Sequence, residues 1–160
     1  IVMGSDSDLP VMEASFDVLR TFGVSFEARI TSAHRTPEAT KAYVQDAAQR
    51  GCAVFIAAAG MAAHLAGAVA AATVNPVIGV PMNASLDGLD ALLSTVQMPA
   101  GIPVATVAIG KAGAKNAAYL AAQILSLADE PLAQRMRDER AANVQEIYAK
   151  DAALQEKLKG

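Results

Sequence analysis

The sequence predicts an α/β fold, a three-layer domain in which a doubly wound parallel sheet is covered by helices on both faces. Short segments that are apolar throughout, such as residues 53–57 and 77–80, alternate along the chain with segments of helical length. Strands of this kind are typical of parallel sheets buried on both faces, because half-exposed strands alternate apolar and polar residues. The 160 residues suit a single domain with a substantial core.

The first strand and helix are predicted within residues 1–22. Residues 1–3 are apolar and precede a glycine, as at the end of a strand, so we expect a few further residues before Ile1. Residues 9–22 have the apolar spacing of a helix, and Gly23 is suited to end it. The apolar side chains predicted on one face of this helix are Met12, Phe16, Leu19 and Phe22.

The later elements follow the same order. Residues 24–30 are predicted as a strand, and Thr36 and Pro37 supply an N-cap and a first-turn proline for a helix that Gly51 closes. Further strands are expected at residues 53–57, 77–80 and 103–109, and further helices at residues 62–72, 88–96 and 112–127.

The composition changes after residue 127. Residues 129–160 are charged and carry apolar side chains at roughly helical spacing, namely Leu132, Met136, Val144, Ile147 and Tyr148. We therefore divide the chain into an α/β domain, residues 1–128, and a C-terminal helical arm, residues 129–160. The arm either packs on its own domain or crosses to a neighbouring subunit, and the sequence leaves both possibilities open.

Composition limits the possible partners and compartments. The net charge of -3 argues against a nucleic-acid-binding surface, which is normally basic. Cys52 is the only cysteine, which excludes an intrachain disulfide and favours the cytoplasm; we expect a buried, inert thiol. The apolar residues 54–74 are mostly alanine and glycine and include His64, so we do not expect a membrane span. The spacing of histidine and cysteine predicts no metal site.

Two polar segments stand where a predicted strand meets a predicted helix, Gly-Ser-Asp-Ser-Asp at residues 4–8 and Ser-Ala-His-Arg-Thr-Pro at residues 32–37. In a doubly wound sheet such loops meet at the carboxyl edge, together with the loop around Gly60. Helix N-termini and an arginine bind phosphate, and a histidine gives and takes protons near neutral pH. These segments predict an enzyme that acts on a small phosphate ester.

Each segment also has a purely structural interpretation. The first can be a turn in which Ser7 or Asp8 caps the following helix, and the histidine and arginine of the second can be solvated surface residues. The small residues 59–63 either expose backbone groups that can recognise a flat heterocycle or a carboxylate, or simply allow tight packing. His64 is expected to be a buried, hydrogen-bonded histidine rather than a catalyst.

Several motifs occur together in uninterrupted order. They are Met-Gly-Ser-Asp-Ser-Asp at residues 3–8, Ser-Ala-His-Arg-Thr-Pro at 32–37, Ala-Ala-His-Leu at 62–65, Pro-Val-Ile-Gly-Val-Pro at 76–81, and Gly-Leu-Asp at 88–90 with Val-Gln-Met-Pro at 96–99. Over residues 1–127 the chain closely resembles N5-carboxyaminoimidazole ribonucleotide mutase, the class I PurE family of purine biosynthesis. The resemblance implies a flavodoxin-like fold, a homo-octamer, and an isomerase that moves a carboxylate from the exocyclic nitrogen to C4 of aminoimidazole ribonucleotide without ATP, biotin, metal or any other cofactor.

The resemblance also implies roles for individual residues. His34 matches the family's proton-transfer residue, Ser5 and Arg35 would lie near the phosphate, and Asp8 near the ribose. The residues that would help to close the pocket are Ser7, Ser32, Gly60, Met61 and Ala62. The chain departs from the family at Met61, where a glycine is frequent, and at Ala66, where a proline is frequent, so the third loop is expected to close differently on the base.

Three other functions remain to be separated from the mutase. A class II relative of the family would carboxylate aminoimidazole ribonucleotide directly, although Ala-Ala-His-Leu at residues 62–65 favours the mutase. A flavodoxin-like module would hold FMN, but the chain has no tryptophan and 4% aromatic residues to flank a flavin. In a structural or regulatory oligomer without catalysis, His34 and Arg35 would have no function.

Overall fold

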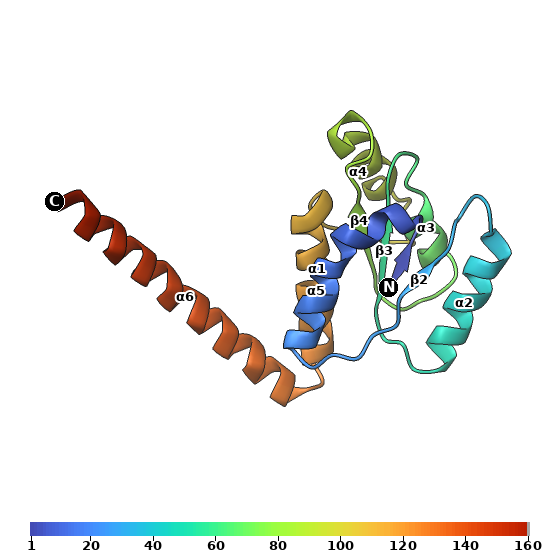
Figure 1. The fold of residues 1–160 in the computed structure, drawn as a ribbon. Helices are drawn as coiled ribbons and strands as arrows, with labels where there is room; N and C mark the ends of the chain where they lie inside the picture. The colour runs from blue at the N-terminus through green and yellow to red at the C-terminus, as the bar shows by residue number, and fades with distance from the viewer. Residues whose placement is uncertain (160) are drawn as a thin grey trace.

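The computed structural model describes residues 1–159, and its five strands form one parallel sheet with the order β2-β1-β3-β4-β5. Helices cover both faces of this sheet (Figure 1), which confirms the predicted α/β fold. The strands are β1 (Val2–Met3), β2 (Arg29–Ile30), β3 (Phe55–Ala59), β4 (Val77–Pro81) and β5 (Ala105–Thr106). The helices are α1 (Leu9–Thr21), α2 (Pro37–Gln49), α3 (Leu65–Ala70), α4 (Leu89–Val96), α5 (Gly110–Ser126) and α6 (Glu130–Lys159), with the 3₁₀ helices η1 (Asp6–Asp8) and η2 (Leu86–Gly88).

The central strand β3 is apolar at every position because it faces a hydrophobic layer on each side. Ile56 and Ala58 belong to the core formed with α1 and α5, whereas Phe55 and Ala57 belong to the core formed with α2 and α3. Side chains alternate between the two faces of a strand, so a strand buried on both faces is apolar throughout. The helical face predicted at residues 9–22 is confirmed, since its four apolar side chains are all buried.

Several strands are shorter than predicted, or displaced. β2 has only two residues because the segment before it packs through side chains, with the ring of Phe26 stacked on Phe16 at a centroid distance of 5.1 Å. β3 begins at Phe55, where the backbone N donates to the carbonyl of Pro76. At the edge of the sheet, β5 is confined to two residues that pair with β4. The length of each strand is thus set by how many of its backbone groups pair with the neighbouring strand.

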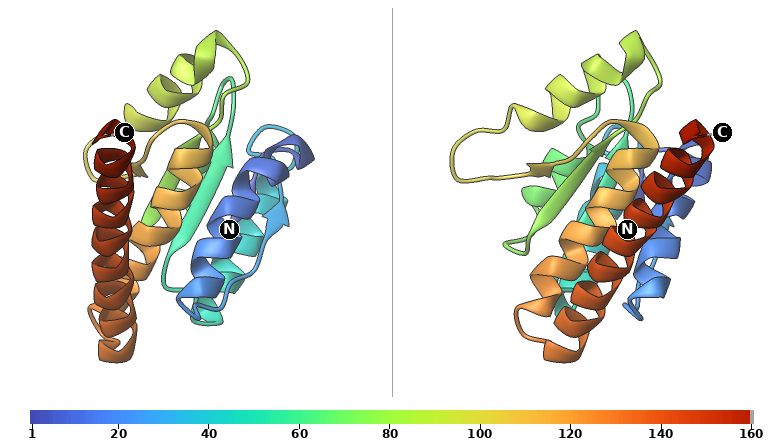
Figure 2. Two further views of the ribbon diagram at one scale, coloured as in Figure 1. Left: turned by 60° about the vertical axis from the view of Figure 1, so that its left-hand side comes forward. Right: turned by 90° about the vertical axis from the view of Figure 1, so that its left-hand side faces the viewer.

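The C-terminal segment is one helix, α6, whose beginning packs on the domain and whose remainder does not. Leu132 is buried among residues of α1 and α5, and the hydroxyl of Tyr119 donates to Oε1 of Glu139 at 2.5 Å. Residues 141–159 are exposed, and Figure 1 shows this part of α6 pointing away from the sheet. In both views of Figure 2 the helix starts at the foot of α5. Packing on the same domain therefore accounts only for the base of α6.

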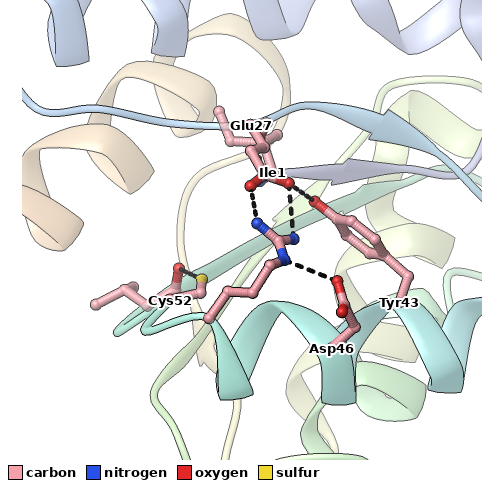
Figure 3. A network of polar contacts seen from close by, with 7 residues as sticks. Ile1, Glu27, Tyr43, Asp46 and Cys52 are labelled. Carbon is pink, nitrogen blue, oxygen red and sulfur yellow. Dashed lines mark hydrogen bonds and ion pairs between the residues drawn. The ribbon is translucent and has the colours of Figure 1, made fainter.

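An ionic cluster connects the amino edge of the sheet to α2 (Figure 3). Glu27 accepts hydrogen bonds from both terminal nitrogens of Arg50 and from the hydroxyl of Tyr43, and Arg50 also pairs with Asp46 at 2.8 Å. The bonds from Arg50 lower the pKa of Glu27 to about 2. Cys52 lies nearby and is half-buried rather than buried as predicted, because it precedes β3 and donates its Sγ hydrogen to the carbonyl of Val54.

None of the helices within residues 1–159 combines the length and the apolar character needed to cross a membrane.

Candidate active site

A cavity of about 510 Å³ opens at the carboxyl edge of the sheet, beside β1, β2 and β3. The chain leaves β1 toward β2 on one side and later returns to β3 on the other, so this edge is the topological switch point where doubly wound sheets bind ligands. The structure brings all nine predicted site residues to its wall. They are Ser5, Ser7, Asp8, Ser32, His34, Arg35, Gly60, Met61 and Ala62.

The loop after β1 is folded by its own side chains. Oγ of Ser5 accepts a hydrogen bond from the backbone N of Ser7 at 3.2 Å, and the backbone N of Ser5 donates to Oδ2 of Asp8 at 3.1 Å. This reciprocal arrangement is a capping box, and it caps η1. The alternative prediction is confirmed in position, since Asp8 is the N-cap residue of α1, but its side chain makes no cap hydrogen bond because the carboxylate turns back to Ser5.

Asp8 is a carboxylate at the buried inner wall of this pocket, with 8% of its surface exposed. Burial raises the pKa of Asp8 above its ordinary value, and hydrogen bonds from the backbone of Ser5 and Gly4 act in the opposite direction. A buried carboxylate is costly unless polar partners surround it. The carboxylate of Asp8 can therefore accept hydrogen bonds from hydroxyl groups that enter the pocket.

Hydroxyl groups fold the loop after β2. Oγ1 of Thr36 accepts from the backbone N of Ser32 at 3.0 Å, and the hydroxyls of Thr31 and the buried Thr40 lie 2.6 Å apart. Thr36 stands at the predicted N-cap of α2, but its side chain does not cap the helix, because it is engaged with Ser32 instead. The threonines at positions 31 and 40 support the site, and the sequence analysis did not identify them.

His34 and Arg35 are exposed at the rim, in the loop between β2 and α2. A terminal nitrogen of Arg35 donates to the carbonyl of Gly4 at 3.4 Å, which places the guanidinium beside the loop after β1. The backbone N of Arg35 donates to Oγ of Ser32 at 3.1 Å and holds the turn. The N-termini of α1 and α2 both begin at this edge, so their dipoles add positive potential to that of the arginine.

The loop after β3 forms the remaining wall. A Cβ atom at Gly60 would lie 2.8 Å from the Cβ of Ala84, so only glycine fits against that neighbouring loop. Met61 has a φ of 55° and is 62% exposed, a left-handed conformation that is costly for a residue with a side chain. The predicted departure at Met61 is thus a point of backbone strain beside the cavity.

His64 was not predicted as a site residue, yet it lines the same cavity. Its Nδ1 lies 2.7 Å from Nε2 of His34, with the ring centroids 4.9 Å apart and the ring planes at 82°. The expectation of a buried histidine is wrong, because α3 begins only at Leu65 and leaves His64 exposed in the loop. Its position in a loop between a strand and a helix, like that of His34, is the sequence signal that could have identified it.

Comparisons with known proteins identify the family of the chain. The model of the family described as AIR carboxylase matches residues 1–146. The chain belongs to the AIR carboxylase family. Among its members, the N5-carboxyaminoimidazole ribonucleotide mutase of Methanocaldococcus jannaschii is 51% identical over 159 residues, which cover 99% of this chain and 98% of that protein. The mutase of Mycobacterium tuberculosis is 55% identical over 158 residues, covering 97% and 88%.

A solved structure has the same fold. The crystal structure of Treponema denticola PurE superimposes with a TM-score of 0.84 at 33% identity, covering 96% of this chain and 95% of that one. The predicted membership of the PurE family is therefore confirmed by sequence and by fold.

Proposed function

We propose that the protein is an N5-carboxyaminoimidazole ribonucleotide mutase of purine biosynthesis. The observation that carries this proposal is the pocket in which an exposed imidazole, His34, adjoins an anion-binding guanidinium, Arg35, and the capped serine loop after β1. Relatives that are 51% and 55% identical carry the name of this enzyme, and they support the choice of substrate.

In the proposed complex the phosphate of the ribonucleotide lies between Arg35 and Ser5, near the N-termini of α1 and α2. Arginine binds phosphate with two parallel hydrogen bonds, and helix N-termini add unpaired N–H groups. The buried carboxylate of Asp8 accepts hydrogen bonds from the ribose hydroxyls. The imidazole base lies against the loop of Gly60, Met61 and Ala62, and Ser7 and Ser32 help to close the pocket.

The proposed reaction proceeds by decarboxylation and recarboxylation. The N-carboxylate leaves as carbon dioxide while His34 gives a proton to the exocyclic nitrogen. C4 then attacks the retained carbon dioxide, and His34 removes the proton from C4. General acid–base catalysis is worth about 10²–10⁴-fold, and holding carbon dioxide beside C4 adds a proximity contribution. No ATP, biotin or metal takes part.

Two experiments test this function. The protein should convert N5-carboxyaminoimidazole ribonucleotide much faster than it carboxylates aminoimidazole ribonucleotide with bicarbonate; faster direct carboxylation would assign the class II activity instead. The variant His34→Asn should fold and bind the nucleotide while losing nearly all turnover, measured by following the imidazole product. Near-normal turnover would remove His34 from the mechanism.

We further propose that residues 1–128 form the catalytic domain, that residues 129–160 form an arm that packs on a neighbouring subunit, and that the enzyme is a cytoplasmic homo-octamer. Large apolar side chains are exposed along η2, α4 and the following loop, namely Leu86, Leu89, Leu93, Val96 and Ile102, and along α6, namely Val144, Ile147 and Tyr148. Rows of exposed apolar residues mark interaction surfaces. Light scattering should give the mass of eight chains, and truncation after residue 140 should lower it.

A further inference from the structure

The contact between His34 and His64 has room for a single proton. Nε2 of His34 and Nδ1 of His64 are 2.7 Å apart, and a ring nitrogen donates when protonated and accepts when not. One of the two facing nitrogens must therefore carry a hydrogen and the other a lone pair. Protonating both would point two N–H groups at each other and break the contact.

We propose that His64 is a positioning residue for His34 that acts by sharing this proton, an inference that rests on the proposed function of His34. With two nitrogens facing each other, the outer nitrogens of the pair are Nδ1 of His34 and Nε2 of His64. Both residues line the cavity, and Nδ1 is the ring nitrogen of His34 that the contact leaves available to exchange a proton with the substrate. The contact with His64 then determines which tautomer of His34 the substrate meets.

The protons balance if the reaction starts with one positive charge on the pair, that is, with three ring hydrogens on four nitrogens. Nδ1 of His34 gives its hydrogen to the exocyclic nitrogen of the substrate, and the hydrogen on Nδ1 of His64 returns to Nε2 of His34. The pair is now neutral, with a lone pair on Nδ1 of His34. That nitrogen takes the hydrogen from C4, the shared hydrogen moves back to His64, and the starting state is restored.

The fixed charges around the pair fit one positive charge and oppose a second. The guanidinium of Arg35 and the N-terminus of α2 stand on the His34 side of the pocket, and both are positive. The carboxylate of Asp8 lies in the same wall and is the negative group of that wall. When His34 takes the hydrogen from C4, sharing lets the positive charge that forms pass to His64, away from the substrate.

The shared proton can be observed directly in the substrate-free protein. The chain contains two histidines, so selective ¹⁵N-histidine labelling yields four ring nitrogens. We expect a scalar coupling between one nitrogen of each ring across the N–H···N bond, and we expect its loss in His64→Asn. The absence of such a coupling in the unsubstituted protein, with each ring showing an independent tautomer, would overturn the proposal.

Kinetics separate proton sharing from simple orientation. His64→Leu should lower kcat by about 10²-fold, the lower range for an acid–base group, with KM nearly unchanged. His64→Asn, whose amide can bond to Nε2 of His34 but cannot take a second proton, should show a similar loss. An Asn variant that matches the unsubstituted protein in kcat would overturn the proposal, since orientation alone would then suffice.

Controls separate a failure of this inference from a failure of the proposed function. Nucleotide binding by calorimetry should be retained in both His64 variants, which shows that the pocket is folded. If His34→Asn loses turnover and the His64 variants do not, only the shared proton is refuted. If His34→Asn itself keeps turnover, the proposed mechanism fails, and the nitrogen coupling still reports whether the pair shares a proton.

Discussion

The backbone N of Ser5 donates to Oδ2 of Asp8 at 3.1 Å, so that the residue that closes the first turn after β1 is also the buried carboxylate of the pocket. A single side chain thus shapes the loop and supplies the acceptor proposed for the ribose. The two roles have opposite consequences for stability, because the hydrogen bond stabilises the loop whereas the buried negative charge destabilises it.

Asp8→Asn should separate these roles. The amide oxygen can still accept from Ser5, but the buried charge is gone, so the free energy of unfolding at pH 7 should stay the same or rise. Nucleotide binding should weaken by at least about tenfold, because a hydrogen bond to a charged group is worth about 1.5–3 kcal/mol. Urea unfolding and binding calorimetry measure the two effects.

The pH dependence of Asp8 follows from its raised pKa. Ionised Asp8 destabilises the folded state at neutral pH, and this cost disappears as the pH falls below the ordinary value of 3.8. Any stability advantage of Asp8→Asn should therefore be present at pH 7 and vanish in strong acid. Glu13→Gln, at an exposed position of α1, is the control. A loss of stability in Asp8→Asn at pH 7 would show that burial is not the dominant effect.

Glu27→Gln should lower stability at neutral pH and not in strong acid. Hydrogen bonds from Arg50 hold the pKa of Glu27 at about 2, below its ordinary value of 4.5. A depressed pKa contributes stability above pH 4.5 that is lost as the pH falls toward 2. The effect should be small, since exposed ion pairs are weak. Urea unfolding at pH 7 and near pH 2 measures it, with the exposed Glu13→Gln as control; equal losses at both pH values would contradict the ion pair.

Ser15→Ala should destabilise the packing of α1 on α5. Ser15 is fully buried, and its hydroxyl donates to the carbonyl of Ala114 at 2.6 Å across the two helices. Removing the donor should lower the free energy of unfolding by about 1 kcal/mol, the typical net value of such a bond. Ser126→Ala, which removes a local bond to the carbonyl of Gln123, should cost less. Equal losses of unfolding free energy in the two variants would show that the bond between the helices stabilises the protein no more than the local bond does.

Met61→Gly should stabilise the loop after β3. Met61 adopts a φ of 55°, which costs roughly 1–2 kcal/mol for a residue with a Cβ atom. Glycine relieves this strain but loses more chain entropy on folding, so we expect a net gain of about 0.5 kcal/mol. Met61→Ala keeps the positive φ and should bring no gain. If both variants raise the melting temperature equally, removal of the exposed thioether rather than the backbone angle is the cause.

The sequence by itself determined the fold class and which residues line the pocket. Apolar strands and helical spacing are local patterns, and the order of strands and helices brings the loops of Ser5, Arg35 and Gly60 to one edge of a parallel sheet. For that reason the predicted site residues all line one cavity.

Only the tertiary structure decided what depends on partners distant in the chain. His34 and His64 meet across 30 positions, and no periodicity encodes a contact between two loops. The length of each strand depends on the backbone of the neighbouring strand with which it forms hydrogen bonds. The side chains of Asp8 and Thr36 accept hydrogen bonds from the backbone of their own loops, at Ser5 and Ser32, and do not cap the helices that follow. Residues 141–159 of α6 are exposed because the helix leaves the domain beyond its contact at Glu139 (Figure 1).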